Sequence, residues 1–446
     1  MSDAEDNPDD IGSRVRSRLR TELGAVLWSL RWIVIGVVVG VIAGLASAAL
    51  LVTLTWATDT RLDHGWLLWL LPAAGLVIGL AYHYSAGRAA EGNNLIIEEI
   101  HQPDAGVPRR MAPLIFAATV VTQLFGGSAG REGTGIQVSV SLNDSLARVL
   151  PFSPADRRVI MISAMSAGFG ALFGVPIAGA LFGLEVQSVG RLRYEGLVPA
   201  LTASLVGDLV VRGLGVKHVP TPELPGFDIT VTSLLRVVAL GVAFGLVGIA
   251  FILGVHSFRH IGSRLLSWPP ARPILGGLLV IGLTLVVGNR DYLGLSLPLA
   301  ESALAGNETS GSVFALKLLF TAVTLGFGFY GGEVTPLMII GSTLGAALAP
   351  VVGLPIALGA ALGYVAVLAG AANIPITCTV MAVEFFGGHA LVPAALACVV
   401  AYIFSSHRSI YETQRIAVTK SHVADVIGMR IRDVGRSVRH RSTDDS

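Results

Sequence analysis

The chain has 446 residues, of which 53% are hydrophobic and only 14% are charged, and its mean hydropathy is +0.70. A water-soluble domain of this length could not hide so much apolar surface, so the composition excludes a soluble globular protein and predicts an integral membrane protein. The formal net charge is only +1, but basic residues concentrate at both ends of the chain.

The N-terminal region changes character before the first long apolar run. Met1 to Asp10 is acidic and lacks the basic and apolar parts of a cleavable signal, so we expect a short disordered tail. Ile11 to Trp32 mixes basic and apolar residues, which predicts an amphipathic helix at the membrane surface. Residues 1–32 are therefore assigned to a cytoplasmic tail and an interfacial helix.

Residues 33–215 are predicted to form the first transmembrane half. Apolar runs such as Trp32 to Leu54 and Gly65 to Tyr82 approach the roughly 20 residues that span a hydrocarbon core. Several expected helices are shorter, and these are tolerated at membrane depth only where they are buried in protein or line an aqueous cavity. The helices are expected at 33–58, 66–87, 91–101, 109–126, 133–149, 156–167, 175–188 and 195–213.

A proline-rich stretch near the midpoint, His218 to Phe227, predicts a linker at residues 216–228. A second transmembrane half is expected at 229–419, and residues 420–446 are assigned to a cytoplasmic tail. Basic residues precede the first span and follow the last, so the positive-inside rule predicts that both termini are cytoplasmic. The helices of this half are expected at 229–257, 271–287, 313–328, 336–350, 355–371, 376–386 and 390–405, with a last helix near 409–419.

Each half contains one Gly-Glu motif that introduces a helix. The first is Gly130-Arg131-Glu132-Gly133-Thr134, and the second is Gly331-Gly332-Glu333-Val334-Thr335-Pro336. Both motifs lie roughly 100 residues into their halves, a pattern typical of internal repeats with a site at their junction. The sequence identity between the halves is too low to demonstrate the repeat.

The first motif has the residues of an anion site with a built-in competitor. A glycine-rich turn that opens a helix exposes free backbone N–H groups at the positive end of the helix dipole. The carboxylate of Glu132 imitates an anion there, so it could occupy the site when ionised and leave it when protonated. The alternative is a structural ion pair with Arg131, because charges at membrane depth mark either ion paths or buried pairs. Glu333 is either a second carboxylate near the anion or an exposed loop residue.

Four motifs in order along the chain resemble the CLC family of chloride channels and anion/proton antiporters. They are the segments 130–133, 176–185 and 331–336, followed by a lone Tyr411 that opens the last helix. The resemblance implies an all-α polytopic membrane protein with two inverted halves of broken, tilted helices. It also implies a homodimer with one pore in each subunit, Glu132 as the gate, and a Tyr411 hydroxyl at the central anion.

Departures from the chloride-selective pattern are similar to the fluoride/proton antiporter branch, whose members export fluoride from bacteria. Asn93 replaces the serine of Gly-Ser-Gly-Ile-Pro, and Thr134 replaces a proline. Val186 stands where chloride/proton antiporters carry an internal proton-handling glutamate. Fluoride holds its water tightly and needs strong donors in exchange, which the Asn93 amide and the Thr335 hydroxyl offer. An asparagine at a helix start is, however, more often a simple cap.

The sequence therefore predicts a fluoride/proton antiporter of the bacterial inner (plasma) membrane that is not an enzyme. A chloride/proton antiporter or a passive chloride channel of the same fold is the alternative. A remote alternative is an intramembrane serine protease, which comes into question because residues 126–130 fit the pattern G-x-S-x-G. The expected partners are fluoride or chloride ions, protons, membrane lipid and a second copy of the chain, with no cofactor, metal or nucleic acid. The predicted residues are Glu132 and Glu333 for gating and proton coupling, and Asn93, Gly130, Arg131, Gly133, Thr134, Val334, Thr335 and Tyr411 for the anion.

Two further sets of residues are interpreted as structural. Cys378 and Cys398 lie in apolar segments without a neighbouring His/Cys cluster, so they are predicted to be buried free thiols. Charged residues within apolar segments are interpreted as structural pairs rather than transport groups, namely Glu185, Asp208, Lys317 and Glu384.

Overall fold

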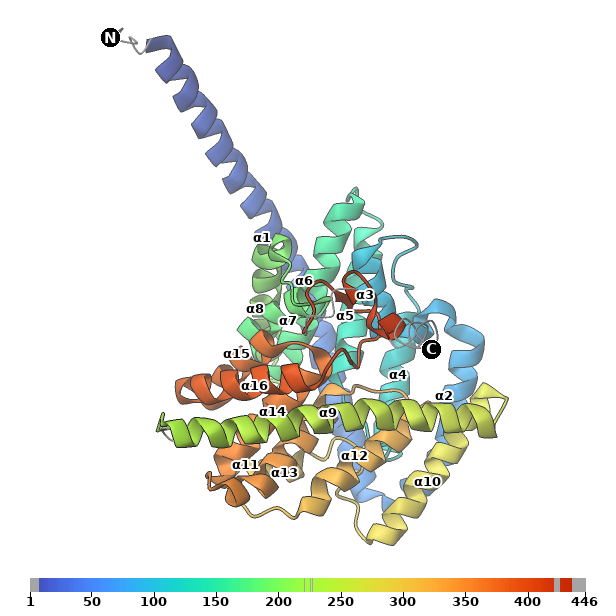
Figure 1. The fold of residues 1–446 in the computed structure, drawn as a ribbon. Helices are drawn as coiled ribbons and strands as arrows, with labels where there is room; N and C mark the ends of the chain where they lie inside the picture. The colour runs from blue at the N-terminus through green and yellow to red at the C-terminus, as the bar shows by residue number, and fades with distance from the viewer. Residues whose placement is uncertain (1–7, 220, 225, 227, 421–425, 435–446) are drawn as a thin grey trace, which may run out of the picture.

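The computed structural model describes residues 8–219, 221–224, 226, 228–420 and 426–434, with side chains from residue 22 onward. This part of the chain is almost entirely helical, as Figure 1 shows. The first half contains α1 Pro8–Asp63, α2 Leu71–Ser85, α3 Asn93–His101, α4 Met111–Leu124, α5 Glu132–Ala147, α6 Pro154–Phe173, α7 Pro176–Glu185 and α8 Leu197–Gly213. The second half contains α9 Val231–Leu265, α10 Arg272–Val287, α11 Leu297–Leu304, α12 Gly311–Gly326, α13 Val334–Val352, α14 Ile356–Ala372, α15 Pro375–Phe386 and α16 Leu391–Phe404.

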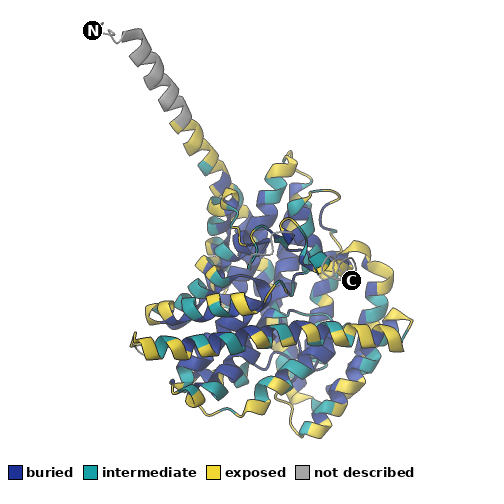
Figure 2. Cartoon of the chain, viewed as in Figure 1, coloured by how far each residue is buried: buried dark blue, intermediate teal, exposed yellow. Residues whose placement is uncertain are grey.

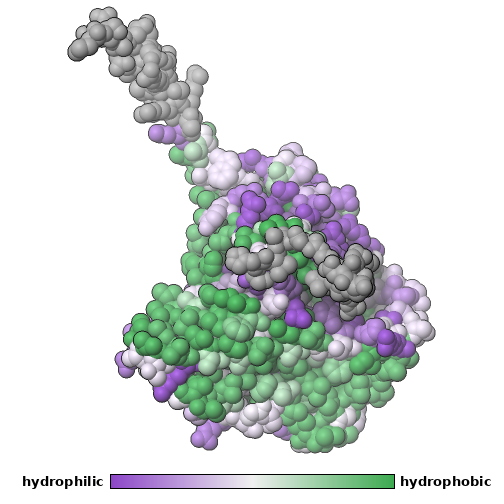
Figure 3. All heavy atoms as spheres, viewed as in Figure 1, coloured by the Kyte–Doolittle hydropathy of each residue, from purple (hydrophilic) through white to green (hydrophobic). Residues whose placement is uncertain are grey.

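Six helical segments in the described part are long and apolar enough to cross a membrane. Buried residues gather where the helices meet (Figure 2), while large apolar side chains such as Val286 and Leu246 remain exposed on the outside. Figure 3 shows the resulting hydrophobic surface over α9 and α16. An apolar exterior of this extent suits contact with lipid. The six segments are Glu22–Asp63, Gly65–Ser85, Tyr194–Gly213, Val231–Leu265, Pro269–Val287 and Val334–Val352.

Three local expectations differ from the structure. The helix expected at 11–32 is not separate from the first span, because α1 runs unbroken from Pro8 to Asp63 and no proline follows Pro8 to interrupt it. The short helix α11 was not anticipated. The helix expected near 409–419 is also absent: this segment forms turns and the strand β2 Arg415–Ile416, which pairs in parallel with β1 Ser188–Val189.

The polar groups of the 409–419 segment explain why it is not helical. The Gln414 amide donates to the carbonyl oxygens of Val186 (2.6 Å) and Ala372 (2.8 Å). The Thr413 hydroxyl donates to the carbonyl oxygen of Asn94 at 2.9 Å. Because its polar groups bond to these distant partners at the ends of other helices, the segment does not form a helix of its own. Tyr411 therefore lies in an irregular segment rather than at a helix start.

The two halves meet through reciprocal contacts, as expected of an inverted repeat. α7 and α15 both begin with Pro-Ile and end near a glutamate. The carboxylate of Glu185 on α7 accepts hydrogen bonds from the first N–H groups of α15, at Ile376 (3.0 Å) and Thr377 (2.7 Å). The carboxylate of Glu384 on α15 accepts from the first N–H groups of α7 in the same way. Each half thus supplies the anion that caps a helix of the other.

Helices α13 and α14 pack backbone to backbone through two pairs of glycines. Gly341 faces Gly363, and Gly345 faces Gly359. A Cβ atom on either member of a pair would overlap the carbonyl oxygen of the other or press closely against it. Both helices carry the glycines at a spacing of four, the arrangement that lets helices approach closely in membranes. This packing fixes α13, whose N-terminus carries the second Gly-Glu motif.

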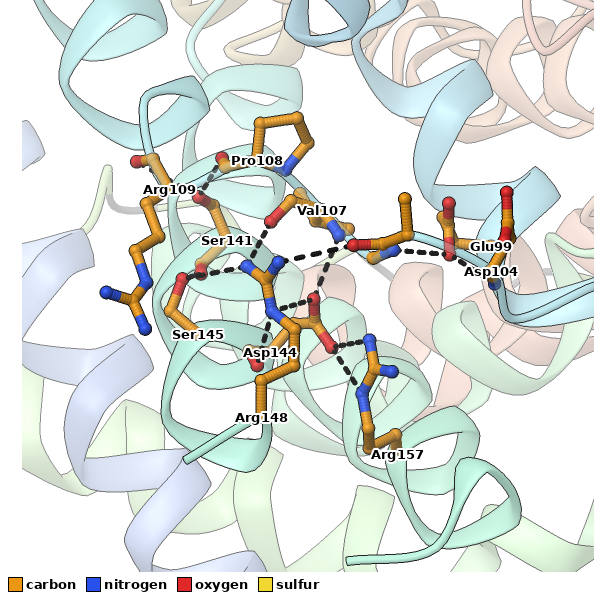
Figure 4. Close-up of polar contacts among 12 residues, drawn as sticks. Glu99, Asp104, Val107, Pro108, Arg109, Ser141, Asp144, Ser145, Arg148 and Arg157 are labelled. Carbon is orange, nitrogen blue, oxygen red and sulfur yellow. Dashed lines mark hydrogen bonds and ion pairs between the residues drawn. The ribbon is translucent and has the colours of Figure 1, made fainter. Parts of the chain in front are cut away.

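A buried carboxylate, Asp144, ties the end of α5 to its surroundings (Figure 4). It accepts hydrogen bonds from Arg157 on α6 at 2.8 Å and from the backbone N–H of Val107 at 2.9 Å, and Arg148 lies 3.3 Å away. The loop that carries Val107 is held to α3 by Glu99, which accepts from the backbone N–H of Gly106 at 3.0 Å. The network thereby links α3, α5 and α6 on the side opposite to the N-termini of α3 and α5.

Replacing Gly345 by valine should strongly destabilise the protein, because two methyl groups would be forced into the α13–α14 backbone contact. Overpacking of this kind costs about 1–3 kcal/mol. Thermal unfolding in detergent should show a lower midpoint for Gly345→Val. The control is Gly282→Val on α10, where no atom lies within 4 Å of the added Cβ. An unchanged midpoint for Gly345→Val would contradict the close packing.

Asp144→Asn should also lower thermal stability, since it removes the negative charge that compensates the partly buried Arg157. Removing one partner of a buried ion pair costs about 3 kcal/mol or more. The matched control is Asp104→Asn in the same network, because the Asp104 residue is exposed and contributes a backbone N–H. Equal unfolding midpoints for the two variants would show that Asp144 does not hold the helices together.

Candidate functional site

Glu132, the first residue of α5, is fully buried at the junction of the two halves. Its Oε2 atom accepts hydrogen bonds from the backbone N–H groups of Arg131 and Thr335, each at 3.1 Å. Thr335 is the second residue of α13, so the carboxylate of the first half lies across the helix start of the second half. Backbone N–H groups at a helix start are a favourable position for an anion. Glu132 therefore occupies an anion position with its own carboxylate.

Arg131 lies beside Glu132, but it does not neutralise the carboxylate through a hydrogen bond. The Arg131 Nε atom is 3.4 Å from Glu132 Oε1. Neither of these two atoms has a hydrogen-bond partner in the described part of the chain. The ion pair with Arg131 is therefore present without a hydrogen bond, while the hydrogen bonds of the carboxylate come from backbone N–H groups.

A pair of backbone hydrogen bonds joins the two Gly-Glu motifs. The N–H of Gly130 donates to the carbonyl oxygen of Gly332 at 2.6 Å, and the N–H of Gly332 donates to Gly130 at 2.8 Å. A Cβ atom on Gly332 would lie 2.9 Å from the backbone nitrogens of both Glu132 and Gly133. Glycine is therefore required here so that the starts of α5 and α13 can converge.

The loop before Glu132 is held by one face of α12. The Ser128 hydroxyl accepts a hydrogen bond from Lys317 Nζ at 2.9 Å, and the backbone N–H of Ser128 donates to Thr324 Oγ1 at 3.1 Å. Thr321 Oγ1 lies 2.9 Å from the same hydroxyl. The three α12 residues are spaced so that they share one helix face. This support was missed in the sequence, where the helical spacing of Lys317, Thr321 and Thr324 was the available signal.

Lys317 is fully buried, and its hydrogen bonds go to neutral oxygens rather than to a carboxylate. Besides Ser128, it donates to the Ser296 hydroxyl at 2.8 Å and to the carbonyl oxygen of Gly294 at 3.0 Å. The expectation of an oppositely charged partner is therefore wrong for Lys317. It holds for Asp208, which pairs with Arg212 at 2.7 Å.

The burial of Ser128 and Lys317 also bears on the serine-protease alternative. Ser128 is completely buried, and its partners are Lys317, Thr321 and Thr324 rather than a histidine. A buried hydroxyl without access for a substrate has no use as a nucleophile. The G-x-S-x-G pattern is accounted for as part of the loop that supports Glu132.

A cavity of about 490 Å³ reaches the Gly-Glu junction from one side. Among its lining residues, Asn93 and Gly133 come from the starts of α3 and α5, Glu333 and Val334 from the start of α13, and Tyr411 from the C-terminal segment. The structure thus brings together residues that are up to 318 positions apart, from 93 to 411. Three Gly-containing helix starts converge on one aqueous space.

Several buried polar atoms around this junction lack a partner in the described part of the chain. They are the Tyr411 hydroxyl, the Thr335 hydroxyl and the side-chain oxygen of Asn93. Unpaired polar groups at membrane depth cost free energy, so native structures rarely gather them without a ligand. The two hydroxyls can donate hydrogen bonds, as can the Asn93 amide nitrogen. The arrangement suits a small anion.

Thr134, which is predicted to contribute to the anion site, has its side-chain hydroxyl turned toward α4. Its hydroxyl lies 2.6 Å from the Thr119 hydroxyl on α4, and both side chains are fully buried. The pair ties α5 to α4 and leaves the Thr134 hydroxyl engaged away from the cavity. Gly130 forms the backbone bridge to Gly332. Arg131 lies next to Glu132 and is not among the residues that line the cavity.

Glu333 precedes α13 and lines the cavity as a partly buried side chain, so it is not an exposed loop residue. Farther out in the same cavity, His256 and Arg259 on α9 face Glu412. The His256 Nε2 atom is 2.6 Å from Glu412 Oε1, and Arg259 is 3.7 Å from it. No local sequence pattern indicates this pair, because 156 positions separate His256 from Glu412.

The chain matches the family model described as voltage gated chloride channel over residues 74–406. It is 44% identical over 383 residues to the "Chloride/fluoride channel protein" of Pseudomonas syringae pv. tomato. That alignment covers 84% of this chain and 84% of the relative. Residues 74–406, which the family model matches, contain both Gly-Glu motifs.

Two solved structures have the same arrangement of helices. A CLC-type fluoride/proton antiporter matches with a TM-score of 0.84 and 32% identity, covering 87% of this chain and 98% of the other. A slow cyanobacterial Cl⁻/H⁺ antiporter matches with a TM-score of 0.71 and 20% identity, covering 84% of this chain and 94% of the other, which shows the shared fold. With its inverted halves and the family match across both motifs, this membrane protein belongs to the voltage-gated chloride channel family, the CLC family.

Proposed function

We propose that this protein is a fluoride/proton antiporter that exports fluoride, and that it is a transporter rather than an enzyme. One observation carries the proposal: the Glu132 carboxylate accepts hydrogen bonds from backbone N–H groups at the junction of the two halves. A group that is an anion when ionised and neutral when protonated links the occupancy of this position to protons. The names of the relatives support fluoride, since one is a chloride/fluoride channel protein and another a fluoride/proton antiporter.

Glu132 acts as the gate in this proposal. When ionised, its carboxylate holds the N–H of Thr335 and excludes the transported anion from that donor. When protonated, it loses most of its attraction to the helix start, and the anion takes its place. Glu333 lines the cavity on the route to the same junction and is the second protonatable group.

The donors around the junction favour fluoride over chloride. Fluoride is small and strongly hydrated, so a site must replace its water with short, well-placed hydrogen bonds. Tyr411 and Thr335 offer hydroxyls without partners in the described chain, and Asn93 offers an amide. Val334 lines the cavity beside these donors with an apolar side chain. Together these groups form the proposed anion site.

The orientation in the membrane follows from charge and from the position of the chain ends. Arginines at 14, 16, 18 and 20 precede the first span, and further basic residues follow the last, which favours cytoplasmic termini in a plasma membrane. In Figure 1 the segment after α16 (red) lies above α9, on the side from which α1 projects. The cavity contains Tyr411 and Glu412 of this segment, so it opens to the cytoplasm in our proposal.

The protein is proposed to act as a homodimer with a separate pore in each subunit. α8 and α16 expose apolar side chains that a second copy could cover, namely Leu205, Leu209, Val399 and Ile403. In detergent, the active protein should have about twice the chain mass of 46.5 kDa, measured by light scattering with detergent correction. An active species of monomeric mass would contradict the dimer.

Purified protein in liposomes should release fluoride much faster than chloride, and protons should move in the opposite direction. The reason is that the unpaired donors compensate the hydration of fluoride better than that of chloride. Ion-selective electrodes and a pH electrode follow the three ions in one experiment. Equal fluoride and chloride rates would contradict selectivity, and fluoride release without proton movement would indicate a passive channel.

Glu132→Gln should abolish proton coupling while some fluoride flux survives, because the amide keeps the shape of the side chain but cannot carry a proton. A positioned acid or base contributes about 100-fold or more to proton transfer, so a loss of that size is expected in the proton flux. Glu333→Gln should weaken coupling in the same assay. The control is Glu308→Gln, an exposed glutamate outside the cavity. Parent-level proton flux in Glu132→Gln would rule out the gate.

A further inference from the structure

Three ionisable side chains gather at the outer part of the cavity that leads to Glu333. His256 and Arg259 lie one turn apart on α9, and Glu412 directly follows Tyr411. The His256 ring bonds Glu412 at 2.6 Å, and its side chain is 42% exposed. Water in the cavity can therefore reach the ring, while Glu412 connects it to the segment that lines the anion site.

Hydrogen bonds hold the backbone at Glu412 in position. Its neighbour Thr413 bonds the carbonyl oxygen of Asn94, and its own carbonyl oxygen accepts from the N–H of Arg432 at 3.1 Å. The hydrogen bond from His256 lowers the pKa of Glu412 below its usual value, so this carboxylate stays ionised at neutral pH. The ionised Glu412 carboxylate therefore orients the imidazole ring through Nε2.

The second ring nitrogen of His256 remains available for exchange. Nε2 faces Glu412, whereas Nδ1 has no hydrogen-bond partner within the described residues. With an unperturbed pKa near 6.5, histidine is the side chain suited to take up and release protons at cellular pH. His256 can thus accept a proton at Nδ1 from cavity water without breaking its bond to Glu412.

The charged groups that act on the Glu333 carboxylate are Arg259, His256 and Glu412. Arg259 also lies 3.7 Å from Glu412. The other titratable or charged side chains that line the cavity are His83, Glu91, Arg272 and the tyrosines Tyr82, Tyr330 and Tyr411. Among these lining groups, His256 is the histidine that the structure places in contact with a carboxylate.

We propose that His256, oriented by Glu412, loads protons onto Glu333 from the compartment to which the cavity opens. The proton leaves Nδ1 of the imidazolium, passes through cavity water and forms the O–H bond of the Glu333 carboxyl group. The ring returns to its neutral form with Nε2–H still bonded to Glu412. This inference rests on the proposed function and names the inner proton route that Val186, an apolar residue, does not provide.

The test measures coupled proton and fluoride fluxes of His256→Ala in liposomes. Proton flux should fall about tenfold, which is less than the roughly 100-fold contribution of a positioned acid or base, because cavity water provides a slower route. Imidazole added to the compartment that the cavity faces should restore it, since the free base replaces the missing ring. The matched control is His83→Ala, which removes a histidine from the same cavity and should leave proton flux unchanged.

A second variant separates the orienting role from the carrier role. Glu412→Gln retains the ring but removes the negative charge beside it, so the pH at which proton flux is half-maximal should shift downward. A structural role alone would change the amount of folded protein, which gel filtration reports, without shifting this pH profile. The shift and the imidazole rescue together support the proposal.

Failure of the inference is distinct from failure of the proposed function. Should the parent protein move fluoride without protons, the antiporter proposal itself is wrong. Should the parent couple the two ions and His256→Ala couple them equally well, the antiporter stands and the role of His256 is overturned. A slowed variant that imidazole does not rescue also overturns it.

Discussion

The contact between the Glu132 carboxylate and the start of α13 is the interaction on which the rest of the site depends. It requires that two helix starts from different halves converge, which the backbone bridge between Gly130 and Gly332 achieves. A side chain at Gly332 would push the halves apart, so glycine is a geometric requirement of the site. The remaining features hold these two helix starts in place: the α13–α14 packing, the face of α12 and the Asp144 network.

These supports differ in chemistry because they act on different groups. α13 is fixed by glycine contacts that let the backbones touch. The loop before Glu132 is fixed by hydrogen bonds from hydroxyls and a buried lysine. The far end of α5 is fixed by a charged pair, where Asp144 also accepts from a loop N–H. Each support leaves the cavity side of the junction free, where Asn93, Val334 and Tyr411 gather.

Much of the fold and the centre of the site could be predicted because the necessary signals are local. Long apolar runs indicate membrane helices, and a glycine-rich turn beside a glutamate indicates a helix start with an unusual carboxylate. The remaining features depend on which distant segments meet. The hydroxyl of Thr134 turns to Thr119, and the segment around Gln414 finds partners more than 40 positions away instead of forming a helix. The pairing of His256 with Glu412 is of the same kind, since no local pattern links α9 to the C-terminal segment.

The reciprocal glutamates of α7 and α15 have a consequence for how the chain matures. During synthesis the first half enters the membrane well before residues 375–384 exist, so the start of α7 has no carboxylate to bind and Glu185 has no helix start to cap. Unsatisfied backbone groups and an uncompensated carboxylate are unfavourable in hydrocarbon. These two caps can therefore form only after α15 has been made, and a chain that stops after the linker would leave α7 uncapped.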